Sequence, residues 1–203
     1  MTNRQLAAME TRKKLIAAGK KIICERGLAN TSIDEITEAC GVSKGTFYTY
    51  FKRKEDIVFE LSSEVFSEIL ENAKVFEGSF LEKLANYMVC FSEYIEKNSV
   101  KLAQDWIRNV VQPEFAKGSD EKSKLQMDLE AVERLVSLGV ENKELRSDVP
   151  VKILSHTIVD LLYGELLCWC ISDGAYSLRE RTQEFCETYL SKLIKPYMIL
   201  KGM

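Results

Sequence analysis

Residues 31–54 constrain the fold more than any other stretch, because they specify two short helices joined by a tight turn. Ser32 is a favourable N-cap residue, and Glu35 three positions later completes a capping box at the start of the first helix. Gly41 follows the apolar positions of that helix and can adopt the left-handed conformation that ends it. Ser43 provides the cap of a second helix almost at once. The stretch therefore predicts a helix-turn-helix arrangement.

The second helix of this turn has two different faces. Phe47 and Phe51 are four residues apart, so they share the face that we expect to be buried. The other side chains provide a cation, hydroxyls and a phenol, and no acidic residue lies between Lys44 and Lys54. Gly45 lets the backbone approach an outside surface closely, as contact with a major groove requires. These features favour DNA binding, although helix–glycine–helix turns also occur in many soluble domains as packing alone.

The string Val-Ser-Lys-Gly-Thr-Phe-Tyr-Thr-Tyr-Phe-Lys-Arg-Lys-Glu-Asp-Ile over residues 42–57 resembles the DNA-binding signature of the TetR/AcrR family of transcriptional regulators. The resemblance extends back over residues 11–27, the usual first helix of that family. It implies that the second helix of the turn enters a major groove, with Phe47 and Phe51 buried. The residues implied near base edges are Lys44, Gly45, Thr46 and Thr49, and those implied on phosphates are Thr31, Ser32, Tyr48, Tyr50 and Lys54.

Charge is divided unevenly along the 203 residues. Residues 1–54 carry 11 basic and 5 acidic side chains, a net charge of +6, whereas the other 149 residues carry 17 and 26, a net charge of −9. A basic segment joined to an acidic one is typical of a DNA-binding domain attached to a part that does not bind DNA. We therefore predict a DNA-binding domain over residues 1–54 and a helical ligand-binding and dimerisation domain over residues 55–203.

Helical periodicity continues along the rest of the chain, and no strand pattern or internal repeat is found. The predicted fold is all-α, with an N-terminal three-helix helix-turn-helix headpiece joined to a larger C-terminal helical bundle and about nine helices in total. Residues 1–8 are expected to form a loose arm and residues 113–119 a loop. The helices outside the turn are expected over residues 10–26, 55–75, 80–97, 100–111, 120–141, 148–172 and 177–201.

The last two predicted helices are strongly apolar. The helix over residues 148–172 is apolar nearly all round, so it must be covered on several sides. The last two helices, over residues 148–172 and 177–201, either close the core of one chain or meet the same two helices of a second copy in a four-helix bundle. A homodimer is the favoured interpretation, because a single short recognition helix buries too little surface to select one site in a genome. Two copies read half-sites about 34–36 Å apart, and the family resemblance implies the same arrangement.

The predicted body contains more large aromatic residues than a small bundle needs, which favours a pocket for an apolar or aromatic small molecule. Most of these residues are individually expected to be core. The predicted function is a ligand-responsive transcriptional regulator, a repressor released from a palindromic operator on double-stranded DNA by such an effector. The residues predicted to line the pocket are Tyr87, Phe91, Trp106, His156 and Tyr163.

The cysteines leave a second regulatory mechanism open. Their spacing fits neither a disulfide framework nor a zinc site, so buried thiols in a reducing cytoplasm are favoured. A redox-responsive regulator that uses Cys168 and Cys170 is the alternative. A small helical enzyme is a remote alternative from a different class, since neither a Ser/His/Asp order nor a glycine-rich phosphate loop is present. No cofactor, metal or catalytic residue is predicted.

The N-terminus is polar and charged, which does not fit a signal peptide. No apolar run is expected to approach the length and hydropathy of a membrane span. The sequence therefore predicts a cytoplasmic protein with no membrane partner.

Overall fold

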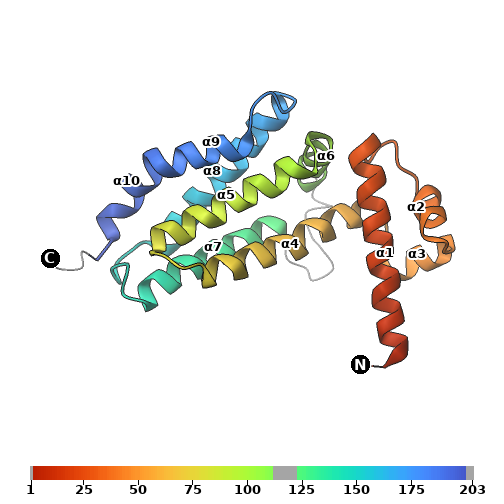
Figure 1. Ribbon diagram of the computed structural model, residues 1–203, viewed down its shortest axis with the longest axis horizontal. Helices are drawn as coiled ribbons and strands as arrows, with labels where there is room; N and C mark the ends of the chain where they lie inside the picture. The colour runs from red at the N-terminus through yellow and green to blue at the C-terminus, as the bar shows by residue number, and fades with distance from the viewer. Residues whose placement is uncertain (1, 112–122, 200–203) are drawn as a thin grey trace. The chain divides into compact units, whose positions relative to one another are not determined.

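The computed structural model describes residues 2–111 and 123–199 (Figure 1). The loop expected over residues 113–119 lies outside these residues, as do the first three positions of the helix expected over 120–141. The described chain forms nine continuous helical stretches and one isolated antiparallel bridge, between Leu145 and Met198. The all-α fold is thereby confirmed.

The chain divides into two compact units. The first comprises Met1–Glu64 and Lys101–Glu121, and the second comprises Val65–Val100 and Lys122–Met203. The division falls within one helix, α4 (Glu55–Val75), whose first half belongs to the first unit. The first unit also takes in most of α6 (Val100–Val110).

The first unit contains the headpiece helices α1 (Asn3–Arg26), α2 (Ile33–Cys40) and α3 (Lys44–Tyr50). The start of α4 packs closely on α1. A β-carbon placed on Gly19 of α1 would lie only 2.7 Å from Ile57 Cδ1 of α4. The headpiece core comprises Leu15, Ile16, Ile23, Leu28, Ile36, Phe47, Phe51, Ile57, Val58 and Leu102.

The expectation of a loose N-terminal arm is wrong for the described residues, since α1 begins at Asn3. Thr2 caps the helix and forms a capping box with Gln5, whose side chain accepts a hydrogen bond from the Thr2 N–H at 2.8 Å. Leu6 is 50% exposed, so burial does not hold this extension in place. Capping together with favourable helix formers is sufficient to start the helix a turn or more before its buried part.

The second unit is a bundle of α5 (Phe80–Asn98), α7 (Lys124–Glu141), α8 (Val151–Ile171) and a C-terminal helical run. That run consists of α9 (Leu178–Phe185), a π-helical turn (Cys186–Leu190), α10 (Ser191–Ile194) and a 3₁₀ turn (Lys195–Tyr197). α5 packs against α7, α8 and α9, and α7 packs against α8 (Figure 1). The second half of α4 contributes Phe66, Ile69 and Ala73 to the core of this unit.

α8 is the most apolar helix of the bundle. In the part of the chain that the structure describes, it is the one helix long and apolar enough to cross a membrane, with a mean hydropathy of 1.3. The expectation that no segment approaches this composition is therefore wrong. One face of α8 is buried in the bundle and includes Leu154, Ile158 and Leu162. A bundle helix that also has an apolar outer face reaches the length and hydropathy of a membrane span without crossing a membrane.

Candidate nucleic-acid interface

The turn between α2 and α3 is built by local capping. Ser32 Oγ accepts a hydrogen bond from the Glu35 N–H at 3.1 Å, and the Glu35 carboxylate accepts one from the Ser32 N–H at 2.8 Å. The hydrogen bonds from the backbone and hydroxyl of Ser32 lower the pKa of Glu35, so this carboxylate stays ionised at the start of α2. Gly41 ends α2 in the left-handed conformation, with φ at 66°. Ser43 caps α3 by accepting a hydrogen bond from the Thr46 N–H at 3.1 Å.

Aromatic side chains fix the inner face of α3. Phe47 is fully buried and Phe51 nearly so, and their ring centroids are 5.4 Å apart. On the outer face Tyr48 is 52% exposed, and the Thr49 hydroxyl donates to the Gly45 carbonyl at 3.1 Å. A β-carbon placed on Gly45 would meet no atom closer than 3.6 Å, so packing within the chain does not require glycine there. The outer face of α3 can therefore lie directly against another surface.

Two of the predicted contact residues on α3 are only half-exposed. The Thr46 hydroxyl lies 2.9 Å from the Ser43 hydroxyl at the helix start. Tyr50 packs against the headpiece core. Both side chains are thus partly used in holding α3.

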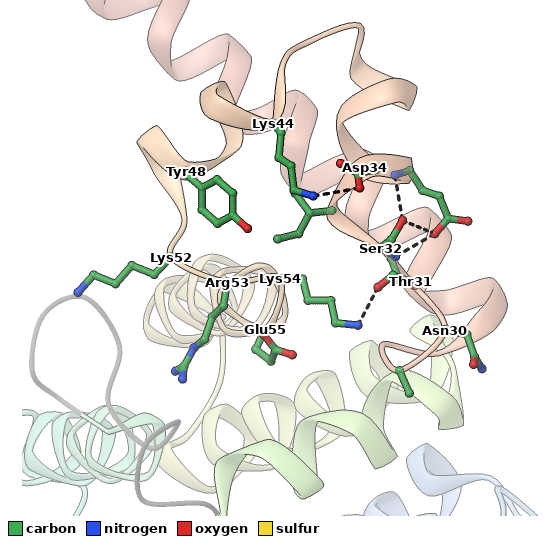
Figure 2. A pocket seen from close by; sticks show the side chains of 13 residues that line it. Asn30, Thr31, Ser32, Asp34, Lys44, Tyr48, Lys52, Arg53, Lys54 and Glu55 are labelled. Carbon is green, nitrogen blue, oxygen red and sulfur yellow. Dashed lines mark hydrogen bonds and ion pairs between the residues drawn. The ribbon is translucent and has the colours of Figure 1, made fainter.

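Lys44 is paired with an acid of the preceding helix. Its Nζ donates to Asp34 Oδ2 at 3.0 Å, and both side chains are at least half exposed (Figure 2). The hydrogen bond and the charge of Asp34 raise the pKa of Lys44, so the side chain is fully cationic at neutral pH. The acid therefore fixes where the ammonium group lies before any ligand arrives.

Lys54 and Thr31 make their contacts within the protein. Lys54 Nζ donates to the carbonyl oxygen of Leu28 at 2.6 Å. It also donates to the carbonyl oxygen of Thr31 at 2.7 Å (Figure 2). Thr31 is 2% exposed, and its hydroxyl donates to the Gly27 carbonyl at 2.8 Å. Both residues thus hold the loop between α1 and α2, which places Ser32 and the start of α2.

Replacing Lys54 with alanine is expected to destabilise the headpiece by about 1–3 kcal/mol, because two carbonyl oxygens lose a charged donor. Urea unfolding of the variant and of Lys52→Ala, a neighbouring exposed lysine, measures this difference. Lys52→Ala should leave the free energy of unfolding within about 0.5 kcal/mol of the wild type. Equal stability of Lys54→Ala and the wild type would show that the ammonium group does not hold the loop.

A groove of about 650 Å³ lies between the start of α2, the outer side of α3 and the start of α4 (Figure 2). Four basic side chains line it: Lys44, Lys52, Arg53 and Lys54. Asp56 binds the Lys52 and Arg53 N–H groups at 2.9 and 3.2 Å and so fixes the backbone of this basic run. Three acidic side chains, Asp34, Glu35 and Glu55, line the groove as well.

The five residues predicted to line a ligand pocket do not share one environment. Tyr87 and Phe91 are buried in the core of the second unit, and Tyr163 packs against that core. His156 is exposed on α8. Trp106 packs against the core of the first unit. Helical periodicity identified apolar faces correctly but did not indicate which core each face enters.

A small apolar cavity does occur in the second unit. Its volume is about 10 Å³, roughly what one water molecule requires, so it must enlarge to take an effector. It is lined by Met88, Leu154, Thr157, Ile158, Leu161, Phe185, Leu190 and Leu193, none of which belongs to the predicted set.

The cysteines are all free thiols. Burial raises the pKa of Cys170 to about 11 and, with neighbouring carboxylates, that of Cys186 to about 12. Both thiols therefore stay protonated at neutral pH, which suppresses their reactivity. Cys168 is exposed. Among the described residues, no group of three or more His, Cys, Asp or Glu side chains is placed to hold a metal ion.

Known proteins share this arrangement. The sequence profile of "Bacterial regulatory proteins, tetR family" matches residues 15–61. The fatty acid metabolism regulator protein of Bacillus subtilis (strain 168) is 25% identical over 184 residues, covering 88% of this chain and 93% of that protein. The HTH-type transcriptional regulator AcrR of Shigella flexneri is 22% identical over 200 residues, covering 95% and 91%. The chain belongs to the TetR family.

A solved structure of a transcriptional regulator shares the fold over nearly its whole length. The transcriptional regulator FadR from Bacillus subtilis, in complex with stearoyl-CoA, superposes with a TM-score of 0.70 at 23% identity. The match covers 89% of this chain and 98% of that chain. The protein is accordingly a DNA-binding transcriptional regulator of the TetR family.

Proposed function

We propose that the protein is a cytoplasmic, homodimeric repressor that binds a two-fold symmetric operator through α3 and is released by a small, largely apolar effector. The observation that carries the proposal is the outer face of α3, which presents Gly45, Tyr48 and Thr49 while Phe47 and Phe51 hold the helix from behind. A seven-residue helix held in this way can enter a major groove with its first residues toward the bases.

The charges and capping of the headpiece support the two kinds of DNA contact. Lys44 is cationic and positioned by Asp34, as a residue that binds a base edge requires. The groove beside α3 brings further cations together, as contact with phosphates requires. We assign to base edges Lys44, Gly45, Thr46 and Thr49, and to the phosphate backbone, directly or by holding the groove, Thr31, Ser32, Tyr48, Tyr50 and Lys54.

The outer face of α8 supports a dimer. Ile153, Leu167 and Ile171 are 69%, 45% and 76% exposed, and their spacing places them in one stripe along the helix. Gly164 lies in the same stripe, and a β-carbon there would meet no atom within 4 Å. His156, Thr157 and Asp160 are also exposed on this face, so its apolar part is the end from Gly164 to Ile171. The same part of a second copy can cover it across a two-fold axis. On the C-terminal run Tyr189 adds a further exposed apolar group.

The effector is proposed to bind among the helices of the second unit, whose core includes Tyr87 and Phe91. FadR from Bacillus subtilis is known with stearoyl-CoA, so long-chain acyl-CoA esters are reasonable first compounds to test. α4 runs without interruption from the first unit into the second, which allows a change in the bundle to reach the headpiece. The effector shifts the DNA-binding equilibrium only by its difference in affinity for the two conformations.

A gel-shift titration with DNA from the region flanking the gene tests the function. We expect salt-sensitive binding to a palindromic site with a dissociation constant of about 10⁻⁸–10⁻¹¹ M, at least about a thousandfold tighter than binding to random DNA. Stearoyl-CoA, added to the complex, tests the first effector candidate. Equal affinity for operator and random DNA at all salt concentrations would contradict the proposal.

The pairing of Asp34 with Lys44 gives a separate prediction. Asp34→Asn frees the Lys44 ammonium, so affinity for random DNA should rise while discrimination between operator and random DNA falls by roughly 1–3 kcal/mol. Competition gel shifts with operator and mutated operator measure both quantities. Glu38→Gln, which removes the same charge from the same helix without a bond to Lys44, is the control. If Asp34→Asn and Glu38→Gln discriminate equally well between operator and random DNA, Asp34 does not position Lys44.

A further inference from the structure

A buried ion pair lies at the start of α7, within the second unit. Lys124 is the first residue of this helix and is 1% exposed, and Asp128 one turn later is 4% exposed. Lys124 Nζ donates to Asp128 Oδ1, and the Tyr163 hydroxyl donates to Asp128 Oδ2 at 2.7 Å. Both carboxylate oxygens are therefore hydrogen-bonded inside the second unit.

One aromatic ring lies against the ammonium group of this pair, and further rings pack on that ring. Lys124 Nζ lies 4.3 Å from the centroid of the Phe66 ring. Phe66 stacks on Phe91 with a centroid distance of 4.5 Å and an interplanar angle of 24°. Tyr87, 1% exposed, has its ring centroid 6.5 Å from that of Phe91. An aromatic face together with a carboxylate is the arrangement that recognises organic ammonium groups.

Packing alone does not account for a lysine in this position. Burial lowers the pKa of Lys124, although the charge of Asp128 opposes the change. A leucine against Phe66 and an apolar residue at position 128 would fill similar space without removing two charges from water. The charged pair therefore needs a reason other than stability.

On the basis of the proposed effector-controlled function, we propose that Lys124 occupies an internal ammonium site and that the effector is an organic ammonium compound with an apolar body. The effector's cation takes the place of Lys124 Nζ between Asp128 and the Phe66 ring. Its apolar part lies against the core of the second unit.

Charge balance favours a cation over the other ligand classes. When one ammonium group replaces another, Asp128 stays paired and Lys124 gains hydration. A carboxylate ligand would instead leave two buried anions to share one lysine, which is costly in a low-dielectric core.

Three six-carbon probes that differ in charge test the proposal: hexylammonium, 1-hexanol and hexanoate. Their binding to the full-length protein is measured by calorimetry and by thermal shift. We expect the wild type to bind hexylammonium and to bind 1-hexanol and hexanoate at least about tenfold more weakly, a difference of about 1.4 kcal/mol. Lys124→Ala should bind hexylammonium at least about tenfold more tightly than the wild type, because the competing side chain is gone.

The double variant Lys124→Ala/Asp128→Asn is the matched control. It keeps the space left by Lys124 but has no carboxylate, so it should lose at least about tenfold in hexylammonium affinity while 1-hexanol binds both variants alike. It contains no buried charge at either position, which keeps the comparison possible if Lys124→Ala alone folds poorly. Equal hexylammonium affinity of the two variants would overturn the proposal. So would binding of hexylammonium by Lys124→Ala but not by the wild type.

DNA binding, measured in parallel, separates this proposal from the proposed function. If hexylammonium binds as expected but operator affinity does not change, the ammonium site stands and effector control through it fails. If the operator is bound and stearoyl-CoA releases it while no ammonium probe binds, the proposed function stands and the ammonium site fails.

Discussion

Replacing Phe47 with alanine is expected to destabilise the headpiece by about 3–5 kcal/mol and to abolish operator binding. Phe47 is fully buried, and it connects the recognition helix to a core that, among the described residues, contains ten buried apolar side chains. α3 has seven residues, so it cannot persist as a helix without this contact. The second unit has its own core and should remain folded. Hydrogen exchange locates the loss of protection in residues 2–64, and gel shifts measure DNA binding.

Tyr48→Ala is the matched control for Phe47→Ala. It removes an aromatic ring from the next position of the same helix, but a ring that is 52% exposed. Hydrogen exchange should therefore resemble that of the wild type, whereas affinity for DNA should fall. If the headpiece is protected from hydrogen exchange equally well in Phe47→Ala and Tyr48→Ala, the inner face of α3 does not hold the helix in place.

The helix-turn-helix was predictable because its determinants are local. Ser32 and Glu35 are three residues apart, Gly41 acts through its own backbone, and Phe47 and Phe51 share a face by helical spacing. Such contacts depend on the sequence of one segment only. The turn therefore follows from residues 31–54 without knowledge of the rest of the chain, whereas the all-α fold class required the helical periodicity of the remaining residues.

The contacts that the sequence did not indicate join segments far apart in the chain. Lys54 binds carbonyl oxygens 23 and 26 residues earlier, where backbone groups carry no sequence signal. Trp106 belongs to an amphipathic helix. The spacing of apolar residues in this helix predicts which face is buried, but not that Trp106 packs against the core of the first unit.

The buried pair in α7 was missed for a related reason. Lys124 and Asp128 have the i, i+4 spacing of an ordinary solvated pair on a helix surface. Their burial depends on Phe66 and Tyr163, which lie on α4 and α8. Spacing within one helix cannot reveal that other helices cover both charges.

Replacing Ile171 with glutamate is expected to separate the proposed dimer and to weaken operator binding by about 100-fold or more, because two tethered headpieces no longer bind together. Ile171 is 76% exposed in the apolar stripe of α8, so the substitution costs little within one chain. Across a two-fold axis it places an anion in an apolar interface, next to the same anion of the second copy. Light scattering measures the mass, and gel shifts measure the operator affinity.

Val75→Glu separates the effect of the α8 stripe from that of any added surface charge. Val75 is 79% exposed, close to the value for Ile171, but it ends α4 and lies outside the stripe. This variant should remain a dimer with the operator affinity of the wild type. If Ile171→Glu also remains a dimer, the copies associate through another surface, and the outer face of α8 requires a different partner. If Ile171→Glu becomes a monomer that binds the operator as tightly as the wild type, one headpiece suffices for recognition and the two-fold operator is the wrong expectation.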